Sequence, residues 1–228
     1  MKKNSINIGV PSKGRLRKDI LKIFTKKKLK LVSERGERDL LGSIENFNNT
    51  KILYLHAREI IERLGDGSLD LGFSGFDLLQ ESNFNIKKKI NVIKKYEFGK
   101  ATLVVAIPDP WIDVQTIADL EEIAFEFKDK KKRLRVATKY PNLTREFLYS
   151  RGVTNFTIVK SLGSTELMCA MNTAQLISDI TSTGTTLKQN NLRILNDGEI
   201  LKSQACIFSS RKNLKKKGVK KLINLLIK

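Results

Sequence analysis

Residues 176–187 read Leu176-Ile177-Ser178-Asp179-Ile180-Thr181-Ser182-Thr183-Gly184-Thr185-Thr186-Leu187. A short apolar run ends in the acid Asp179, and hydroxyl side chains then surround Gly184. This order is typical of a strand that ends at a carboxylate and passes through a turn into a helix. A helix N-terminus offers free N–H groups and partial positive charge, the hydroxyls add neutral donors, and glycine lets the backbone approach an anion. The stretch therefore predicts a pocket for a sugar phosphate; the alternative is a Thr/Ser-rich turn that only caps a helix.

Strand and helix patterns alternate along the whole chain. Ile6, Ile8 and Val10 alternate as a strand, and apolar residues at helical spacing follow from Leu16 to Leu29. By the same patterns we expect strands at residues 51–55, 101–107, 134–138, 156–159, 175–180, 192–195 and 205–209. Helices are expected at residues 57–64, 76–81, 116–127, 142–151, 166–171 and 213–227. Such alternation predicts α/β layers with mostly parallel sheets.

Length and composition limit the class of protein. The 228 residues suit one large or two small domains with an ample apolar core. No apolar run reaches the roughly 20 residues needed to span a bilayer, and residues 1–4 lack the apolar segment of a signal peptide. Cys169 and Cys206 form no Cys-x-x-Cys spacing. We therefore expect a cytoplasmic protein without a membrane partner.

The formal net charge of +19 raises the possibility of nucleic-acid binding, because clustered lysines neutralise phosphates. Lysine runs occur at residues 26–28, 87–89, 130–132 and 215–217. These runs are scattered over separate elements, and no aromatic residues interleave with them as a stacking platform requires. We expect no nucleic-acid partner; the positive field instead favours small anionic substrates.

Five further blocks stand in a fixed order along the chain: Val10–Leu16 (Val-Pro-Ser-Lys-Gly-Arg-Leu), Asp70–Leu78, Phe98–Pro108, Arg135–Arg145 and Gly163–Glu166. Together with the Asp179 loop they resemble the short form of the ATP phosphoribosyltransferase family, the catalytic subunit of the first step of histidine biosynthesis. The resemblance extends from about residue 6 to residue 210, which is nearly the whole chain.

The resemblance implies a two-lobed α/β fold like that of type II periplasmic binding proteins, with the active site in the interlobe cleft. The first lobe would comprise residues 1–97 completed by 187–228, and the second residues 98–186. Because the chain stops where long-form members continue into a regulatory domain, the short form is expected. Members of that form are similar in assembling as homodimers or larger complexes and with a regulatory subunit like histidyl-tRNA synthetase.

The implied reaction transfers the phosphoribosyl group from phosphoribosyl pyrophosphate to N1 of ATP and releases pyrophosphate. Adenine N1 already carries a lone pair, so no nucleophilic side chain is required, in keeping with a chain that has one histidine. Mg²⁺ is the expected cofactor, bridging pyrophosphate oxygens. Such an ion keeps most of its waters, so no protein metal ligand is assigned.

The resemblance also assigns the site residues. Phosphoribosyl pyrophosphate would be bound by Asp179, through ribose hydroxyls, and by Thr181, Ser182, Thr183, Gly184, Thr185 and Thr186. ATP would be bound by Lys13, Gly14, Arg15, Arg38, Lys139, Tyr140 and Glu166. Catalytic roles fall to Asp179, Lys13, Arg15 and Glu166. For Glu166 the alternative is that the acid only complements a helix dipole. Asp70 and Asp77 flank the Gly72–Gly75 turn and could meet a ligand, or could serve only in helix capping and turn stabilisation.

The chain departs from the family pattern in a few places. His56 stands where many members have arginine, and a neutral imidazole cannot replace a guanidinium as a phosphate clamp. Asn172 and Asn191 stand where glycine is usual, and asparagine tolerates left-handed backbone geometry, so both should preserve the turn. A rival class, a solute-binding or sensor protein with the same fold, would have no need of the Asp179 loop.

Overall fold

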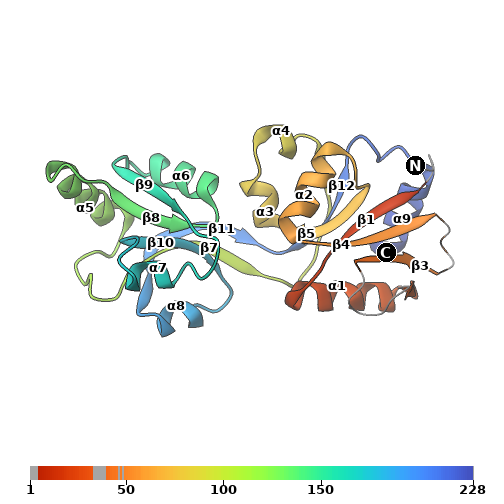
Figure 1. The fold of residues 1–228 in the computed structure, drawn as a ribbon, viewed down its shortest axis with the longest axis horizontal. Helices are drawn as coiled ribbons and strands as arrows, with labels where there is room; N and C mark the ends of the chain where they lie inside the picture. The colour runs from red at the N-terminus through yellow and green to blue at the C-terminus, as the bar shows by residue number, and fades with distance from the viewer. Residues whose placement is uncertain (1–4, 33–39, 46, 48, 228) are drawn as a thin grey trace. The chain divides into compact units, whose positions relative to one another are not determined.

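The computed structural model describes residues 5–32, 40–45, 47 and 49–227, and the chain divides into two compact units (Figure 1). Unit 1 comprises Met1–Gly99 with Gln204–Lys228, and unit 2 comprises Lys100–Ser203. The prediction that residues 187–203 belong to the first lobe is wrong. The strand β11 (Leu192–Ser203) pairs antiparallel with β7 (Ala101–Pro108), so the second crossover comes after Ser203 rather than after Leu187.

Unit 1 contains a seven-stranded sheet in the order β2-β3-β4-β1-β5-β12-β6. Its central strands β4 (Thr50–Leu55), β1 (Ile6–Pro11) and β5 (Leu71–Gly75) run parallel. The strand β12 (Ala205–Ser210) pairs antiparallel with β5 and with the edge strand β6 (Ile90–Lys95). The strands β2 (Leu31–Val32) and β3 (Leu41–Ile44) extend the other edge.

Helices cover both faces of this sheet (Figure 1). On one face α1 (Gly14–Lys26) and α9 (Lys217–Ile227) bury a cluster that includes Phe24, Phe73 and Leu222. On the other face α2 (Ala57–Asp66) and α3 (Phe76–Glu81) pack against Phe208, and α4 (Phe84–Lys87) follows α3. Alternate side chains of each strand point to opposite faces, which is why β12 contributes to both clusters.

Unit 2 contains a five-stranded sheet in the order β11-β7-β10-β8-β9. The strand β8 (Leu134–Thr138) runs parallel to both β10 (Leu176–Thr181) and β9 (Phe156–Lys160), whereas β7 is antiparallel to β10 and β11. The helices α5 (Ile117–Asp129) and α6 (Pro141–Ser150) cover one face. The short helices α7 (Leu167–Ala170) and α8 (Thr185–Gln189) contribute to the cluster on the other face.

The predicted α/β layering is confirmed, but the prediction of mostly parallel sheets is wrong. Parallel pairing occupies the β4-β1-β5 and β10-β8-β9 segments, and antiparallel strands flank both. The antiparallel strands β7, β11 and β12 adjoin the two crossovers, where the chain passes directly between sheets without a covering helix.

Within the described residues, no helix is both long and apolar enough to cross a membrane.

Two asparagines adopt the backbone geometry expected of them. Asn172 and Asn191 both have φ of 53°, in the left-handed region that glycine otherwise occupies. Asn172 follows α7, and Asn191 lies between α8 and β11. The substitution of asparagine for glycine therefore leaves both turns intact.

Candidate functional site

Three polar loops of unit 2 follow neighbouring parallel strands. Lys139 and Tyr140 follow β8, residues 161–166 follow β9, and residues 182–184 follow β10. Since β10, β8 and β9 run in the same direction, these loops leave the same edge of the sheet. The carboxyl edge of parallel strands is where α/β proteins bind ligands. Most of the predicted site residues of unit 2 are gathered there.

Asp179 lies within β10 rather than at its end, because the strand continues to Thr181. Its Oδ1 accepts a hydrogen bond from the N–H of Ile180 at 2.8 Å, and its Oδ2 lies 3.8 Å from Nζ of Lys139. The Asp179 side chain is 14% exposed and that of Lys139 is 38% exposed. One carboxylate oxygen is thus held by the backbone, while the other faces a half-exposed ammonium group.

The hydroxyl–glycine loop forms a tight turn between β10 and α8. Gly184 has φ of +75°, and its N–H donates to Oγ1 of Thr181 at 2.9 Å. A Cβ on Gly184 would meet no atom within 4 Å, so the left-handed backbone is what requires glycine here. Oγ1 of Thr183 and Oγ1 of Thr185 lie 2.8 Å apart on the exposed side of the turn. Ser182 and Thr186 are also exposed, so the turn presents hydroxyl groups to solvent at the start of α8, where the N–H of Thr185 donates to Oγ1 of Thr183 at 3.4 Å.

Beneath this edge lies a buried network of hydroxyl groups that the sequence analysis did not identify. Oγ1 of Thr144 lies 2.9 Å from Oγ of Ser178 and 3.3 Å from Oγ1 of Thr138. The N–H of Tyr140 donates to Oγ1 of Thr138 at 2.9 Å. Thr138, Thr144 and Ser178 are fully buried. The network ties the start of α6 to the end of β8 and to the middle of β10, next in the chain to Lys139 and Asp179. The available signal was a hydroxyl residue directly after an apolar run, at Thr138 and at Ser178.

Glu166 and Tyr140 occupy different environments at this edge. Glu166 is half-buried and precedes the four-residue helix α7, with helical φ and ψ of −58° and −28° and no side-chain hydrogen bond that caps the helix. Tyr140 is 6% exposed and precedes α6. The structure therefore leaves Glu166 accessible to a ligand and places the Tyr140 ring in the interior.

In unit 1, the exposed Lys13 ends the turn between β1 and α1, and the exposed Gly14 and Arg15 begin α1. Gly14 has φ of +83° at the start of the helix, and Lys13 before it is extended. The turn lies at the carboxyl end of β1, between the parallel neighbours β4 and β5. Arg38, the remaining predicted ATP ligand, lies outside the described residues.

Three other polar residues singled out from the sequence have contacts within unit 1. Asp70 is 1% exposed and accepts hydrogen bonds from the N–H of Asn7 and from Nζ of Lys216, both at 2.7 Å. Asp77 is buried in the first turn of α3. His56 caps α2, and its Nδ1 accepts from the N–H of Arg58 at 3.3 Å. The contacts of Asp70 join distant parts of unit 1, so its role there is structural but is neither helix capping nor turn stabilisation. Asp77 lies where an acid complements the dipole of α3.

The two cysteines are poor nucleophiles. Burial raises the pKa of the Cys169 thiol and of the Cys206 thiol to about 11, so both stay protonated near neutral pH. Among the described residues, no three or more His, Cys, Asp and Glu side chains are grouped closely enough to hold a metal ion. The arrangement at the carboxyl edge can thus bind and orient an anion with vicinal hydroxyls, but it offers no activated nucleophile.

Two α/β units joined by two crossovers define a protein of the type II periplasmic-binding-protein-like fold. The arginine-, lysine-, histidine-binding protein ArtJ of Geobacillus stearothermophilus is similar to it, with a TM-score of 0.57 and 10% identity over 98% of this chain and 90% of that chain. The ATP phosphoribosyl transferase (HisG:HisZ) complex of Thermotoga maritima is more similar, with a TM-score of 0.73 and 24% identity over 97% and 96%. These likenesses show the fold.

Residues 56–228 match the family model HisG, ATP phosphoribosyltransferase, and the chain belongs to this family. The ATP phosphoribosyltransferase of Nitrobacter winogradskyi is 47% identical over 208 residues, which are 91% of this chain and 64% of that protein. The chain therefore spans just under two thirds of the length of this relative. The ATP phosphoribosyltransferase of Rhizobium etli is 40% identical over 210 residues, which are 91% of both chains.

Proposed function

We propose that this chain is an ATP phosphoribosyltransferase, a glycosyltransferase of histidine biosynthesis. It would transfer the phosphoribosyl group from phosphoribosyl pyrophosphate to N1 of ATP and release pyrophosphate. The observation that carries the proposal is the position of Asp179 beside the Thr181–Thr186 turn, at the carboxyl edge of parallel strands, in a chain that belongs to this family.

The geometry of unit 2 suits phosphoribosyl pyrophosphate. The 5-phosphate would lie against the N-terminal N–H groups of α8 and the hydroxyls of Ser182, Thr183, Thr185 and Thr186. Ribose hydroxyls would donate to Oδ2 of Asp179, since Oδ1 already accepts from Ile180. Thr181 would act through the turn, because its Oγ1 accepts from Gly184. Lys139, 3.8 Å from Asp179, would neutralise a neighbouring phosphate oxygen.

The remaining residues would bind ATP and the leaving group. Lys13 and Arg15, with the backbone at Gly14, are exposed donors for ATP phosphates or for departing pyrophosphate. Glu166 would orient adenine or a ribose hydroxyl, and Arg38 and the Tyr140 segment would complete the ATP site. No general base is needed because adenine N1 attacks through its own lone pair. Positioning of two polyanions and neutralisation of developing charge would lower the barrier.

Mg²⁺ fits this donor set only as an ion bound largely by the substrate. Asp179 is the carboxylate next to the loop, and within the described residues it belongs to no larger group of metal-binding side chains. Magnesium commonly takes one or two carboxylates and keeps waters and phosphate oxygens as its other ligands. When bound, the ion would neutralise the pyrophosphate oxygens; the protein residues would hold the ribose and the 5-phosphate.

We further propose that the chain acts in the cytoplasm, as a homodimer or larger assembly, in the short form of the family. The structural relative from Thermotoga maritima is a HisG:HisZ complex, which supports a partner subunit of the HisZ type, similar to histidyl-tRNA synthetase. A fully active monomer in sedimentation at micromolar concentration would contradict the oligomer.

The activity is tested by mixing the chain with ATP, phosphoribosyl pyrophosphate and Mg²⁺ and following the absorbance of phosphoribosyl-ATP. The chain is assayed alone and with a HisZ-type subunit, in the presence and absence of histidine. We expect product formation, with a rate or histidine sensitivity that depends on the partner. A folded chain that forms no product under either condition would overturn the proposal, and binding of a free amino acid instead would favour a solute sensor.

A further inference from the structure

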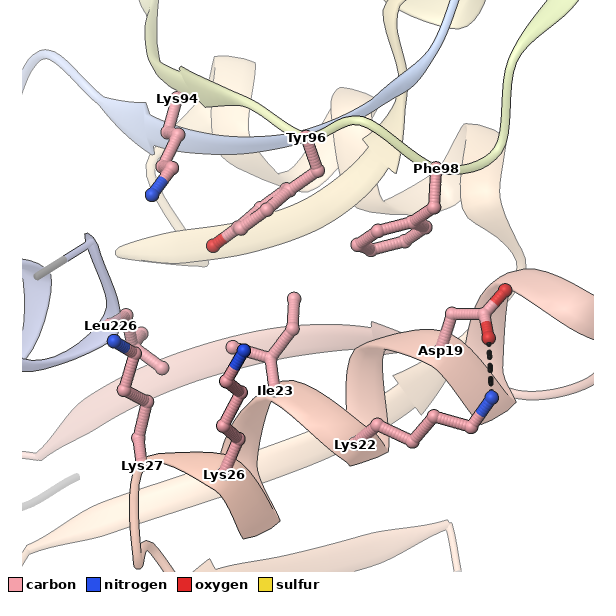
Figure 2. A pocket seen from close by; sticks show the side chains of 9 residues that line it. All are labelled: Asp19, Lys22, Ile23, Lys26, Lys27, Lys94, Tyr96, Phe98 and Leu226. Atoms are coloured by element: carbon pink, nitrogen blue, oxygen red, sulfur yellow. Dashed lines mark hydrogen bonds and ion pairs between the residues drawn. The ribbon is translucent and has the colours of Figure 1, made fainter.

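Unit 1 contains a pocket on the face of its sheet that α1 and α9 cover. It lies between α1 and the edge strand β6 with the segment that follows it, and its volume is about 360 Å³ (Figure 2). Small-molecule sites commonly occupy about 300–1,000 Å³. All residues that line the pocket belong to unit 1, and none of them belongs to the site proposed above.

Two facing walls of the pocket are apolar. Ile23 contributes from α1, and Tyr96 and Phe98 contribute from the other wall. The rings of Tyr96 and Phe98 are stacked, with centroids 5.3 Å apart and an interplanar angle of 28°. Such a surface suits a planar apolar group, which would stack on these rings and remove them from water.

The rim of the pocket is basic. Lys26 and Lys27 reach it from the end of α1, and Lys94 reaches it from β6 (Figure 2). Lys94 Nζ donates to the carbonyl oxygen of Ile227 at 3.0 Å and lies 5.6 Å from the centroid of the Tyr96 ring. Lys26 and Lys27 have no ion pair among the described residues. Asp19 also lines the pocket, but its carboxylate is paired with Lys22 at 3.0 Å. The remaining lysines therefore leave a net positive charge next to the apolar walls.

The Tyr96 hydroxyl provides an independent observation. Tyr96 is 9% exposed, and within the described part of the chain its hydroxyl group has no hydrogen-bond partner. Figure 2 shows this oxygen directed into the pocket, toward the space between Lys94 and Lys26. A buried hydroxyl without a partner is costly, so such groups usually mark a missing ligand or water. Burial raises the pKa of Tyr96 to about 12, so the phenol remains a hydrogen-bond donor at neutral pH.

We propose that this pocket binds a small organic anion with a flat apolar body, whose acidic group accepts the Tyr96 hydroxyl between Lys26 and Lys94. The flat body would stack on Tyr96 and Phe98. The lysine side chains at the rim have long flexible stems and can move to admit the acid group. Phe98 immediately precedes the first crossover at Gly99, so the ligand would bind next to the segment that joins the units.

The probe for this site is 8-anilinonaphthalene-1-sulfonate, an aryl anion whose fluorescence rises in apolar surroundings. N-phenyl-1-naphthylamine supplies the same aromatic body without the acid group. Both are titrated into the full chain in 0.2 M NaCl, where screening suppresses weak binding to scattered surface lysines. We expect saturable binding of one sulfonate per chain, and weaker binding of the neutral amine.

Three variants locate the binding. Tyr96→Phe removes only the hydroxyl and should weaken sulfonate binding about tenfold or more, while binding of the neutral amine is unchanged. The melting temperature of this variant without ligand should not fall, because an unpaired buried hydroxyl is removed. Lys26→Gln should weaken sulfonate binding about two- to fivefold. Lys18→Gln, on the same helix but outside the pocket, is the matched control and should bind as the unaltered chain does.

Lys26 also complements the partial negative charge at the C-terminus of α1, and the rival hypothesis is that this is its sole role. In that case Lys26→Gln would lower the melting temperature and leave sulfonate binding unchanged. That result would overturn the proposal. The same holds if Tyr96→Phe binds the sulfonate as tightly as the unaltered chain, or if Lys18→Gln weakens binding as much as Lys26→Gln does. The absence of saturable binding to the unaltered chain would also overturn it.

Discussion

Replacement of Asp179 by asparagine tests the sugar-phosphate site most directly. The amide can keep the acceptor that binds the N–H of Ile180, but it replaces the outer oxygen with a donor. The ion pair with Lys139 is long, at 3.8 Å, and the lysine side chain is 38% exposed. Its loss should therefore contribute at most about 1 kcal/mol to the free energy of unfolding.

The effect on substrate use should be larger. A hydrogen bond between a ribose hydroxyl and a carboxylate contributes roughly 1.5–3 kcal/mol. Its loss corresponds to a fall of about ten- to a hundredfold in kcat/KM for phosphoribosyl pyrophosphate. Steady-state kinetics with each substrate varied in turn should show this fall, while the dissociation constant for ATP, measured separately by calorimetry, stays near that of the unaltered chain.

Asp197 provides a closely matched control in the same unit. Its Oδ1 accepts the N–H of Ile117 at 2.8 Å, and its Oδ2 lies 3.8 Å from Nη1 of Arg151, so its two oxygens have the same kinds of partner as those of Asp179. Asp197→Asn should change stability by a similar amount and leave the kinetics unchanged. If the two variants had equal kinetics, or if Asp179→Asn lost only stability, the carboxylate would be a structural residue of the turn.

Three further predictions concern stability and are tested by urea unfolding. Thr144→Val should lower the free energy of unfolding by about 1–3 kcal/mol, because it leaves the buried Ser178 hydroxyl without its partner and removes one of the two hydrogen bonds of Thr138. Thr144→Ser should retain most of this stability. Hydrogen bonds from the N–H groups of Gln115 and then Thr116 hold the pKa of Asp119 below its ordinary value. The ionised Asp119 therefore stabilises the fold above its ordinary pKa, and this stabilisation is lost as the pH falls through the lowered pKa. Asp119→Asn should be less stable than the unaltered chain at pH 7, and the two should become equally stable in acid. Lys131→Gly should raise stability by about 1 kcal/mol, since Lys131 has φ of +56°; an unchanged midpoint would contradict this.

Local sequence patterns predicted the parts of the site that depend on neighbouring residues. The strands expected at residues 134–138 and 175–180 form β8 and β10, although β10 continues past Asp179 to Thr181. Gly184 has the backbone geometry that its turn requires. Asn172 and Asn191 adopt left-handed geometry for the same local reason. These features follow from side-chain size, hydrogen bonding and backbone sterics within a few residues, which a single sequence contains.

Features that depend on distant residues were not predicted. The strand β11 continues to Ser203, although Asn196-Asp197-Gly198 reads as a turn. Its pairing with β7 shifts register between Ile194 and Glu199, and such a bulge breaks the alternation by which strands are recognised. The error in the domain boundary has the same cause. The contact between Thr144 and Ser178 joins residues 34 positions apart, and it requires both the parallel pairing of β8 with β10 and the packing of α6 on this sheet.

The lysine runs have structural explanations that reduce the case for nucleic-acid binding. The runs at residues 26–28, 87–89 and 130–132 each begin in the last turn of a helix or directly after it, where positive charge complements the helix dipole. After α1 the N–H groups of Lys28 and Leu29 close the turn by donating to the carbonyls of Thr25 and Phe24, and the same two bonds recur after α5. In the fourth run, Lys216 is paired with the buried Asp70. Three of the four lysine runs thus lie at helix ends, and the fourth contains the partner of a buried acid; the runs belong to separate elements of both units. A continuous track for a nucleic-acid backbone would require these charges to line one groove, whereas a small anion needs only the few that surround a single pocket.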